Sequence, residues 1–370
     1  MGKEFIPAPT EMAQNYVHEI YKNSYKQVDA LMISFDVNIR FFTGANVSDA
    51  ILLATRSGWC YLFVDSRYYE EALKTAKQCK VILLTNRKKQ LTEIFKEHSV
   101  KELAIEADQI TIKQFKKLKN DFPDINFIVD EFVSDTIRDI RAIKKNSEVK
   151  KIKKAQEISE EALNLIIKND IAEGVTEIQL AVKYYEYITS LGAEKTSFDT
   201  IILFGENSSK PHGIPTNRRL KKNDNILIDC GAVFDGYCSD MTRNFVFGTP
   251  SEEYVNIYNI VLEAQKRALD AAKCHAKTNI VDSAAREYIK EHGFGDCFGH
   301  ATGHGVGMEI HEFPSLSSSI ENILSPGMIV TVEPGIYLPE KFGIRIEDLI
   351  EITEDSAYLI SDFSKELNVL

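Results

Sequence analysis

The segment "NILIDCGAVFDGYCSDMTRNF", residues 225–245, contains two aspartates within what its pattern predicts to be one β-hairpin. Asp229 ends an apolar run, and Asp240 follows the turn-forming residues Phe234-Asp235-Gly236. A hairpin folded about this turn pairs residues whose numbers sum to about 469 to 471. The numbers of Asp229 and Asp240 sum to 469, so the two residues are expected to be cross-strand partners or close to it.

The negative charges of two carboxylates in this arrangement must be balanced by a positive charge. Like charges directly opposite each other destabilise a sheet, and burial increases the cost because both groups lose their hydration. A cation is therefore expected between Asp229 and Asp240. The alternative is that both are surface residues of an ordinary hairpin, one of them capping a turn.

A second segment, "GHATGHGVGMEIHE" at residues 299–312, places His300, His304 and His311 among four glycines. Glycines such as Gly305 and Gly307 allow the backbone to approach other groups closely, which suits a crowded site better than a packed helix. Any one of these histidines alone could be an ordinary core or surface residue. Three within a dozen positions favour a functional site.

Two glutamates interrupt apolar strands nearer the C-terminus. Glu333 ends a predicted strand in "TVEPGIY", residues 331–337, and Glu347 is expected inside another strand, in "GIRIEDL", residues 343–349. Each glutamate either pairs with a cation such as Arg345 or binds a metal ion.

The combined candidates are two aspartates, two glutamates and one histidine. This oxygen-rich set differs from the Cys and His ligands of a structural zinc site. Two divalent ions would neutralise four carboxylates, and bridging carboxylates hold such ions ~3.5–4 Å apart in two-metal hydrolysis. Manganese, cobalt and iron suit these donors, and zinc also accepts them.

Composition and charge narrow the classes of function and cellular location that the chain can have. The chain has 370 residues, is 44% hydrophobic and carries a formal charge of −11, which disfavours nucleic-acid binding. It contains no run of about 18 apolar residues, so no membrane span is expected. The start of the chain lacks a secretory pattern, and the six cysteines show no C-x-x-C spacing. Free thiols and a cytoplasmic location are therefore expected.

The pattern along the chain predicts two domains, residues 1–140 and 145–370. Apolar runs at 30–35, 50–54, 59–64, 80–84 and 103–106, with a helical segment at 68–78, indicate an α/β domain. Asn146-Ser147 then resembles a helix N-cap pair, followed by apolar residues at steps of three and four, which predicts a long amphipathic helix. Further helices are expected at 178–189, 252–273 and 281–291, and β patterns dominate after residue 198.

These motifs resemble the pita-bread metallopeptidase superfamily of methionine aminopeptidases, creatinase and the proline-specific peptidases. The match is closest to the Xaa-Pro branch, prolidase and aminopeptidase P, and covers nearly the whole chain. The resemblance implies a creatinase-like N-terminal α/β domain and a C-terminal pita-bread α+β catalytic domain. It implies two divalent ions, with manganese favoured over cobalt, zinc or iron, and assigns as ligands Asp229, Asp240, His304, Glu333 and Glu347.

Further motifs support the same branch. "FGENSSKPHGIP", residues 204–215, resembles the segment that carries an active-site histidine, here His212, and His311 matches a substrate-contacting histidine. "NIRFFTG" (38–44) and "FVDSRYY" (63–69) resemble the creatinase-type N-terminal domain, which simple methionine aminopeptidases lack.

The implied reaction is hydrolysis of the bond between an N-terminal residue and proline by a metal-activated water. His212 and His311 would bind the substrate carbonyl or oxyanion, and Glu333 would carry the proton to the leaving nitrogen. Arg345, and similarly Tyr337, would orient a ligand, while His300 either lines the site or has a structural role.

The expected substrates are short peptides with proline second, and a homodimer is expected from the family. The sequence leaves open whether the enzyme cleaves only dipeptides or also longer Xaa-Pro-Yaa chains. The alternatives are an aminopeptidase of this fold without proline preference and a non-catalytic peptide-binding module.

Overall fold

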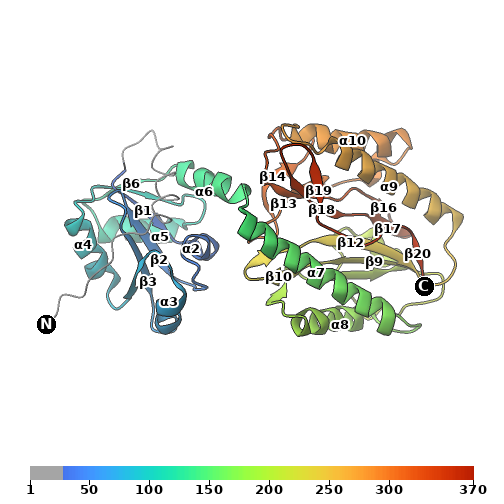
Figure 1. The fold of residues 1–370 in the computed structure, drawn as a ribbon, viewed down its shortest axis with the longest axis horizontal. Helices are drawn as coiled ribbons and strands as arrows, with labels where there is room; N and C mark the ends of the chain where they lie inside the picture. The colour runs from blue at the N-terminus through green and yellow to red at the C-terminus, as the bar shows by residue number, and fades with distance from the viewer. Residues whose placement is uncertain (1–27) are drawn as a thin grey trace. The chain divides into compact units, whose positions relative to one another are not determined.

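The computed structural model describes residues 28–370, and the chain divides into two compact units between Ile140 and Arg141 (Figure 1). The boundary falls near the end of helix α6 (Phe132–Ala142). Within the described range, no helix is long and apolar enough to cross a membrane. The six cysteines are all free thiols.

In its described part, the first unit is a mixed sheet with strand order β4-β3-β2-β1-β5-β6. Side chains alternate between its faces, so that Leu31 and Ile33 join one apolar cluster and Ala30 and Met32 another. The strands are β1 (Ala30–Ile33), β2 (Ile51–Thr55), β3 (Cys60–Val64), β4 (Lys80–Leu83), β5 (Glu102–Ile105) and β6 (Asn126–Ile128). The helices before α6 are α2 (Asp36–Thr43), α3 (Tyr69–Thr75), α4 (Arg87–Glu97) and α5 (Ile112–Asp121). The five predicted strands are present, and α3 covers most of the predicted helix.

The second unit places a pair of helices on each side of its strands (Figure 1). One core joins α7 (Asn146–Asn169) and α8 (Glu177–Ser190) to the sheet of order β20-β12-β9-β8. Another joins α9 (Glu252–Ala271) and α10 (Thr278–Glu291) to strands of the sheet of order β14-β13-β15-β18-β19.

The strands of these two sheets are β8 (Ile201–Phe204), β9 (Asn225–Cys230), β12 (Met241–Val246), β13 (Gly303–Gly305), β14 (Glu312–Leu316), β15 (Ile329–Val332), β18 (Asp348–Ile352), β19 (Ala357–Leu359) and β20 (Asn368–Val369). Smaller sheets are formed by β7 (Lys195–Thr196), β10 (Ala232–Phe234) and β11 (Tyr237–Cys238), and by β16 (Gly335–Leu338) and β17 (Phe342–Arg345). Single 3-10 turns are η1 (Gly205–Ser209) and η2 (Gly295–Cys297).

The long helix α7 forms because its apolar residues recur on one face and are buried there, as the spacing predicts. The N-cap of this helix is Lys145, one residue before the predicted Asn146. The backbone N–H of Lys145 donates to Glu148 Oε2 at 2.8 Å. Helix α8 begins with a capping box in which Thr176 and Gln179 bond each other's backbone N–H groups.

The hairpin that contains the two aspartates has a register of 471, the upper end of the predicted range. Thr242 lies opposite Asp229, and Met241 opposite Cys230, so Asp240 stands just before β12 and diagonal to Asp229. The prediction that Glu347 lies inside a strand is wrong. The chain leaves the sheet of β16 and β17 and enters that of β18 at this point, so Glu347 occupies the break between strands.

Gly231 should be essential to this hairpin. A Cβ atom at this position would collide with the carbonyl oxygen of Ser239 and the hydroxyl of Ser197, so the strands would have to separate. We expect Gly231→Ala to lower the free energy of unfolding by roughly 1–3 kcal/mol, the usual cost of overpacking. Urea denaturation measures this, with Gly299→Ala as the matched control because nothing lies within 4 Å of a Cβ there. Equal stability of the two variants would contradict the prediction.

Candidate metal centre

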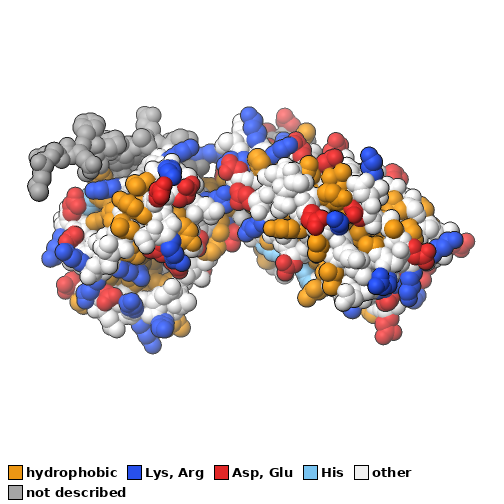
Figure 2. All heavy atoms as spheres, turned by 90° about the horizontal axis from the view of Figure 1, so that it is seen from below, with side chains coloured by type: hydrophobic (Ala, Val, Ile, Leu, Met, Phe, Trp, Pro, Cys, Tyr) orange, Lys and Arg blue, Asp and Glu red, His pale blue; other side chains and the backbone are white. Residues whose placement is uncertain are grey.

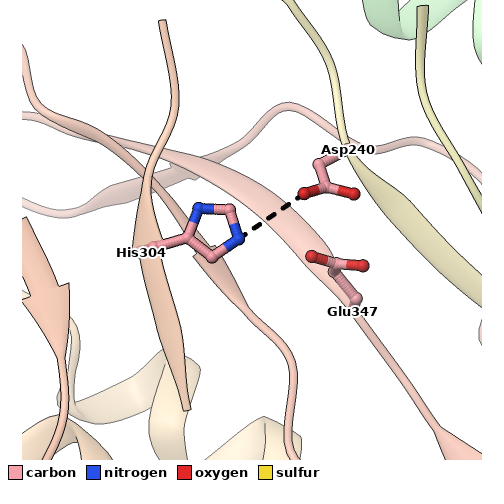
Figure 3. A group of neighbouring side chains, drawn as sticks. All are labelled: Asp240, His304 and Glu347. Carbon is pink, nitrogen blue, oxygen red and sulfur yellow. Dashed lines mark ion pairs between the residues drawn. The ribbon is translucent and has the colours of Figure 1, made fainter. Parts of the chain in front are cut away.

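Asp240, His304 and Glu347 point toward one another (Figure 3). Asp240 directly precedes β12, His304 lies within β13, and Glu347 occupies the break between β17 and β18. One ligand atom from each lies within 4.8 Å of the others. His304 Nδ1 faces the carbonyl oxygen of Gly305 at 3.1 Å and must donate to it, which leaves a lone pair on Nε2. That Nε2 atom lies 3.6 Å from Asp240 Oδ2 and 3.3 Å from Glu333 Oε1. A lone pair facing carboxylates is favourable only when a proton or a metal ion lies between them.

The other predicted ligands, Asp229 and Glu333, line the same cavity. Asp229 is buried, and its Oδ1 atom has no hydrogen-bond partner within the described chain, although such atoms are rarely left unpaired. Glu333 directly follows β15, and Thr331 Oγ1 donates to its Oε1 at 3.2 Å. The structure therefore brings all five predicted ligands to one place.

The electrostatics of this group call for a cation. Burial raises the pKa of Asp240 and Glu347 well above the ordinary values, and the negative charges of neighbouring carboxylates raise them further. Burial and the charge of Asp229 raise the pKa of Glu333 to about 7, although Arg345 opposes this. Divalent ions would relieve this repulsion. The orphaned Asp229 oxygen and the oxygen-rich donor set thus fit such ions.

The buried Arg345 connects several of the candidate ligands through hydrogen bonds. Its Nη2 contacts Asp229 Oδ2 at 2.6 Å, and its Nε donates to Thr242 Oγ1 at 3.0 Å. Thr242 in turn donates to Glu347 Oε2 at 2.7 Å. One guanidinium therefore orients two candidate ligands, one directly and one through a hydroxyl group. Sequence reasoning missed Thr242, which stands two residues after Asp240 and carries no pattern of its own.

His300 ends a second chain of hydrogen bonds from the same arginine. Arg345 Nη1 donates to Tyr337 Oη at 2.6 Å, and Tyr337 Oη lies 2.9 Å from His300 Nε2. His300 Nδ1 faces the carbonyl of Ala301 at 2.8 Å and donates to it, so Nε2 accepts from the tyrosine. Burial, reinforced by Arg345, lowers the pKa of His300 to about 4, so the ring is neutral at pH 7. His300 lines the cavity with both ring nitrogens engaged.

The cavity has a volume of about 650 Å³, and apolar side chains form part of its wall beside the carboxylates that line it. His212 and His311 both line it, and both residues are exposed. Histidine side chains are visible beside hydrophobic ones on the face of the second unit shown in Figure 2. The apolar lining consists of Phe198, Ile201, Pro211, Ile214, Pro215 and Ile310.

Buried carboxylates fix two of the loops around the cavity, and sequence reasoning missed both. Glu177, at the start of α8, accepts hydrogen bonds from the backbone N–H groups of Phe204 and Thr216, each at 2.8 Å, which flank the loop of His212. Asp282 contacts Arg286 at 2.7 Å, and Arg286 donates to the His300 carbonyl at 2.7 Å. The only sequence signal was an acidic residue within an otherwise ordinary helix.

Carboxylates and an imidazole that converge on a cavity, carried by a two-unit α/β chain, define the class of metal-dependent hydrolases. The chain belongs to metallopeptidase family M24, whose model matches residues 150–354. The creatinase/prolidase N-terminal domain model matches residues 23–143. The family implies divalent metal ions, and the predicted resemblance and fold class are confirmed.

Relatives cover nearly the whole chain. The Xaa-Pro dipeptidase of Pyrococcus furiosus is 39% identical over 92% of this chain and 95% of its own length. The solved structure of an Xaa-Pro dipeptidase from Bacillus anthracis has a TM-score of 0.92 and 33% identity, covering 97% of this chain and all of the other. That of an X-Pro aminopeptidase from Thermotoga maritima has a TM-score of 0.87 and 34% identity, over 93% of this chain and 98% of the other.

Loss of divalent ions should destabilise the protein. A ligand at 100 times its Kd contributes about 2.7 kcal/mol, so Mn²⁺ added after chelation should raise Tm by roughly 5–10 °C for a unit of this size. Asp240→Asn should abolish the shift because it removes a charged ligand. Thermal denaturation with and without Mn²⁺ measures this. Asp235→Asn, in the exposed turn of the same hairpin, is the control and should respond like wild type. A full shift in Asp240→Asn would contradict the assignment.

Proposed function

We propose that this protein hydrolyses the peptide bond between an N-terminal residue and proline, as a metal-dependent Xaa-Pro peptidase. The observation that carries the proposal is the convergence of Asp240, His304 and Glu347 in a cavity with an apolar wall. The names of its relatives, Xaa-Pro dipeptidase and X-Pro aminopeptidase, support the same substrate class. Residues 1–140 would form the creatinase-like domain and residues 145–370 the catalytic domain.

The five candidate ligands would hold two divalent ions, with manganese favoured. When bound, such ions supply a Lewis acid for the scissile carbonyl and lower the pKa of water. Glu333 would move a proton to the leaving proline nitrogen. His212 and His311 would donate hydrogen bonds to the substrate carbonyl oxygen, and the apolar wall would take the proline ring. Arg345 would hold Asp229 and Thr242 in place throughout.

One observation favours peptides longer than two residues. Among the described residues that line the cavity, Arg345 is the one lysine or arginine, and its contacts are with Asp229, Thr242, Tyr337 and the Pro211 carbonyl. The exposed Asp199 adds negative charge to the wall. A dipeptide would bring a free carboxylate beside the proline, whereas a longer peptide presents a neutral amide there. Cleavage of Xaa-Pro-Yaa peptides is therefore the second candidate function.

The free thiols agree with a reducing, cytoplasmic location, which we include in the proposal. We also propose a homodimer, by analogy with the family alone.

Four substrates separate these readings. We expect the Mn²⁺-loaded protein to cleave Ala-Pro and Ala-Pro-Ala but not Ala-Ala, because the apolar wall selects proline. Ala-Pro-amide should be cleaved at least as well as Ala-Pro, since the described cavity offers no spare cation for a carboxylate. Release of alanine, followed by chromatography, measures all four. Equal cleavage of Ala-Ala would indicate an aminopeptidase without proline preference. Failure to cleave any of the four would indicate a binding module.

A further inference from the structure

The His311 ring has little to hold it in place. It stacks edge-on against His304, with ring centroids 4.4 Å apart, and it makes no hydrogen bond to any other residue of the described chain. His311 is also exposed. Its position must therefore come from the backbone of the turn that carries it, residues 307–312.

Glu312, the next residue, closes this turn from inside. Its side chain is only 6% exposed, and its Oε1 accepts from the backbone N–H of Glu309 at 3.1 Å. The same carboxylate fills the space beside Gly307, where a Cβ atom would collide with it. The Gly307 N–H donates to the Glu309 carbonyl at 3.1 Å, which tightens the turn further.

Two buried cations fix the Glu312 carboxylate. Arg141 Nη2 lies 2.5 Å from Oε1, and Lys144 Nζ lies 3.1 Å from Oε2, with side-chain exposures of 8% and 1%. Arg141 also bonds Glu309 at 2.8 Å, and the Lys144 backbone N–H donates to the Gly327 carbonyl at 2.8 Å. Both cations are thus tied to the same unit by further bonds, so they offer a rigid anchor.

We propose that Glu312 is a positioning residue for His311, and that Arg141 and Lys144 hold it in the required orientation. The inference rests on the proposed function, in which His311 contacts the substrate. Glu312 lines the cavity, but within the described residues the hydrogen bonds of its carboxylate go to Arg141, Lys144 and the Glu309 N–H and not to any of the five candidate ligands. It acts through the turn, and so its effect should vanish when His311 no longer has a function.

A double-mutant cycle tests this. Glu312→Gln should lower kcat/KM for Ala-Pro-Ala roughly 10- to 100-fold, mostly in kcat, because small misplacements of a positioning group are costly. In a His311→Ala background the same substitution should change kcat/KM by less than about twofold. Bound manganese should stay at the wild-type amount in all variants. Glu351→Gln, which breaks the Lys153–Glu351 pair at 2.9 Å elsewhere in this unit, is the matched control and should leave kcat/KM near wild type.

The outcomes are distinct. A purely structural role for Glu312 would reduce the active fraction equally in both backgrounds, so an equal loss would overturn the inference. If Glu312→Gln does not fold, Lys144→Gln in the same cycle replaces it, with the same expectation of a loss confined to the background that retains His311. Absence of cleavage by the wild-type protein would instead overturn the proposed function.

Discussion

The catalytic unit depends on one buried guanidinium among carboxylates. Arg345 is 3% exposed and holds Asp229 directly and Glu347 through Thr242, yet it supplies a single positive charge to a group that contains four carboxylates. An uncompensated buried charge is among the most costly features a fold can contain. The protein alone therefore supplies too little positive charge to balance these buried carboxylates. The raised pKa values of Asp240, Glu333 and Glu347 reflect the same lack of positive charge.

The strand arrangement explains how such a group is tolerated. Each candidate ligand lies in a strand, at its end or in the break between two strands, so backbone hydrogen bonds fix its position independently of its charge. The Glu333 N–H donates to the Thr302 carbonyl at 2.7 Å, and the Glu347 N–H to the Thr242 carbonyl at 3.3 Å. Apolar cores behind both sheets stabilise these strands. The hydrophobic packing thus supports a group that opposes folding when no cation is present.

The sequence predicted the parts of the site that are encoded locally. The turn of the hairpin predicted the strand register to within two residues, and the motifs around His304, Glu333 and Glu347 predicted residues that line one cavity. It could not predict contacts between residues far apart in the chain, such as Thr242 with Glu347 or Glu177 with Thr216. The strand break at Glu347 could not be predicted for a similar reason. The apolar residues on both sides of Glu347 continue the strand pattern in the sequence, but the strands that they belong to pair in different sheets.

The loops around the cavity are held in place by buried carboxylates. Glu177, Asp282 and Glu312 are carboxylates with side chains that are buried or nearly so, and each supports a segment that carries a histidine of the cavity. Loops have backbone N–H groups without ladder partners, and a carboxylate can accept several of them at once. A misplaced buried carboxylate would lose these bonds, and Asp282 and Glu312 would also lose their cationic partners, so each loop has one strongly preferred position. His212 and His311 can then remain exposed for a substrate while the backbone beneath them stays fixed.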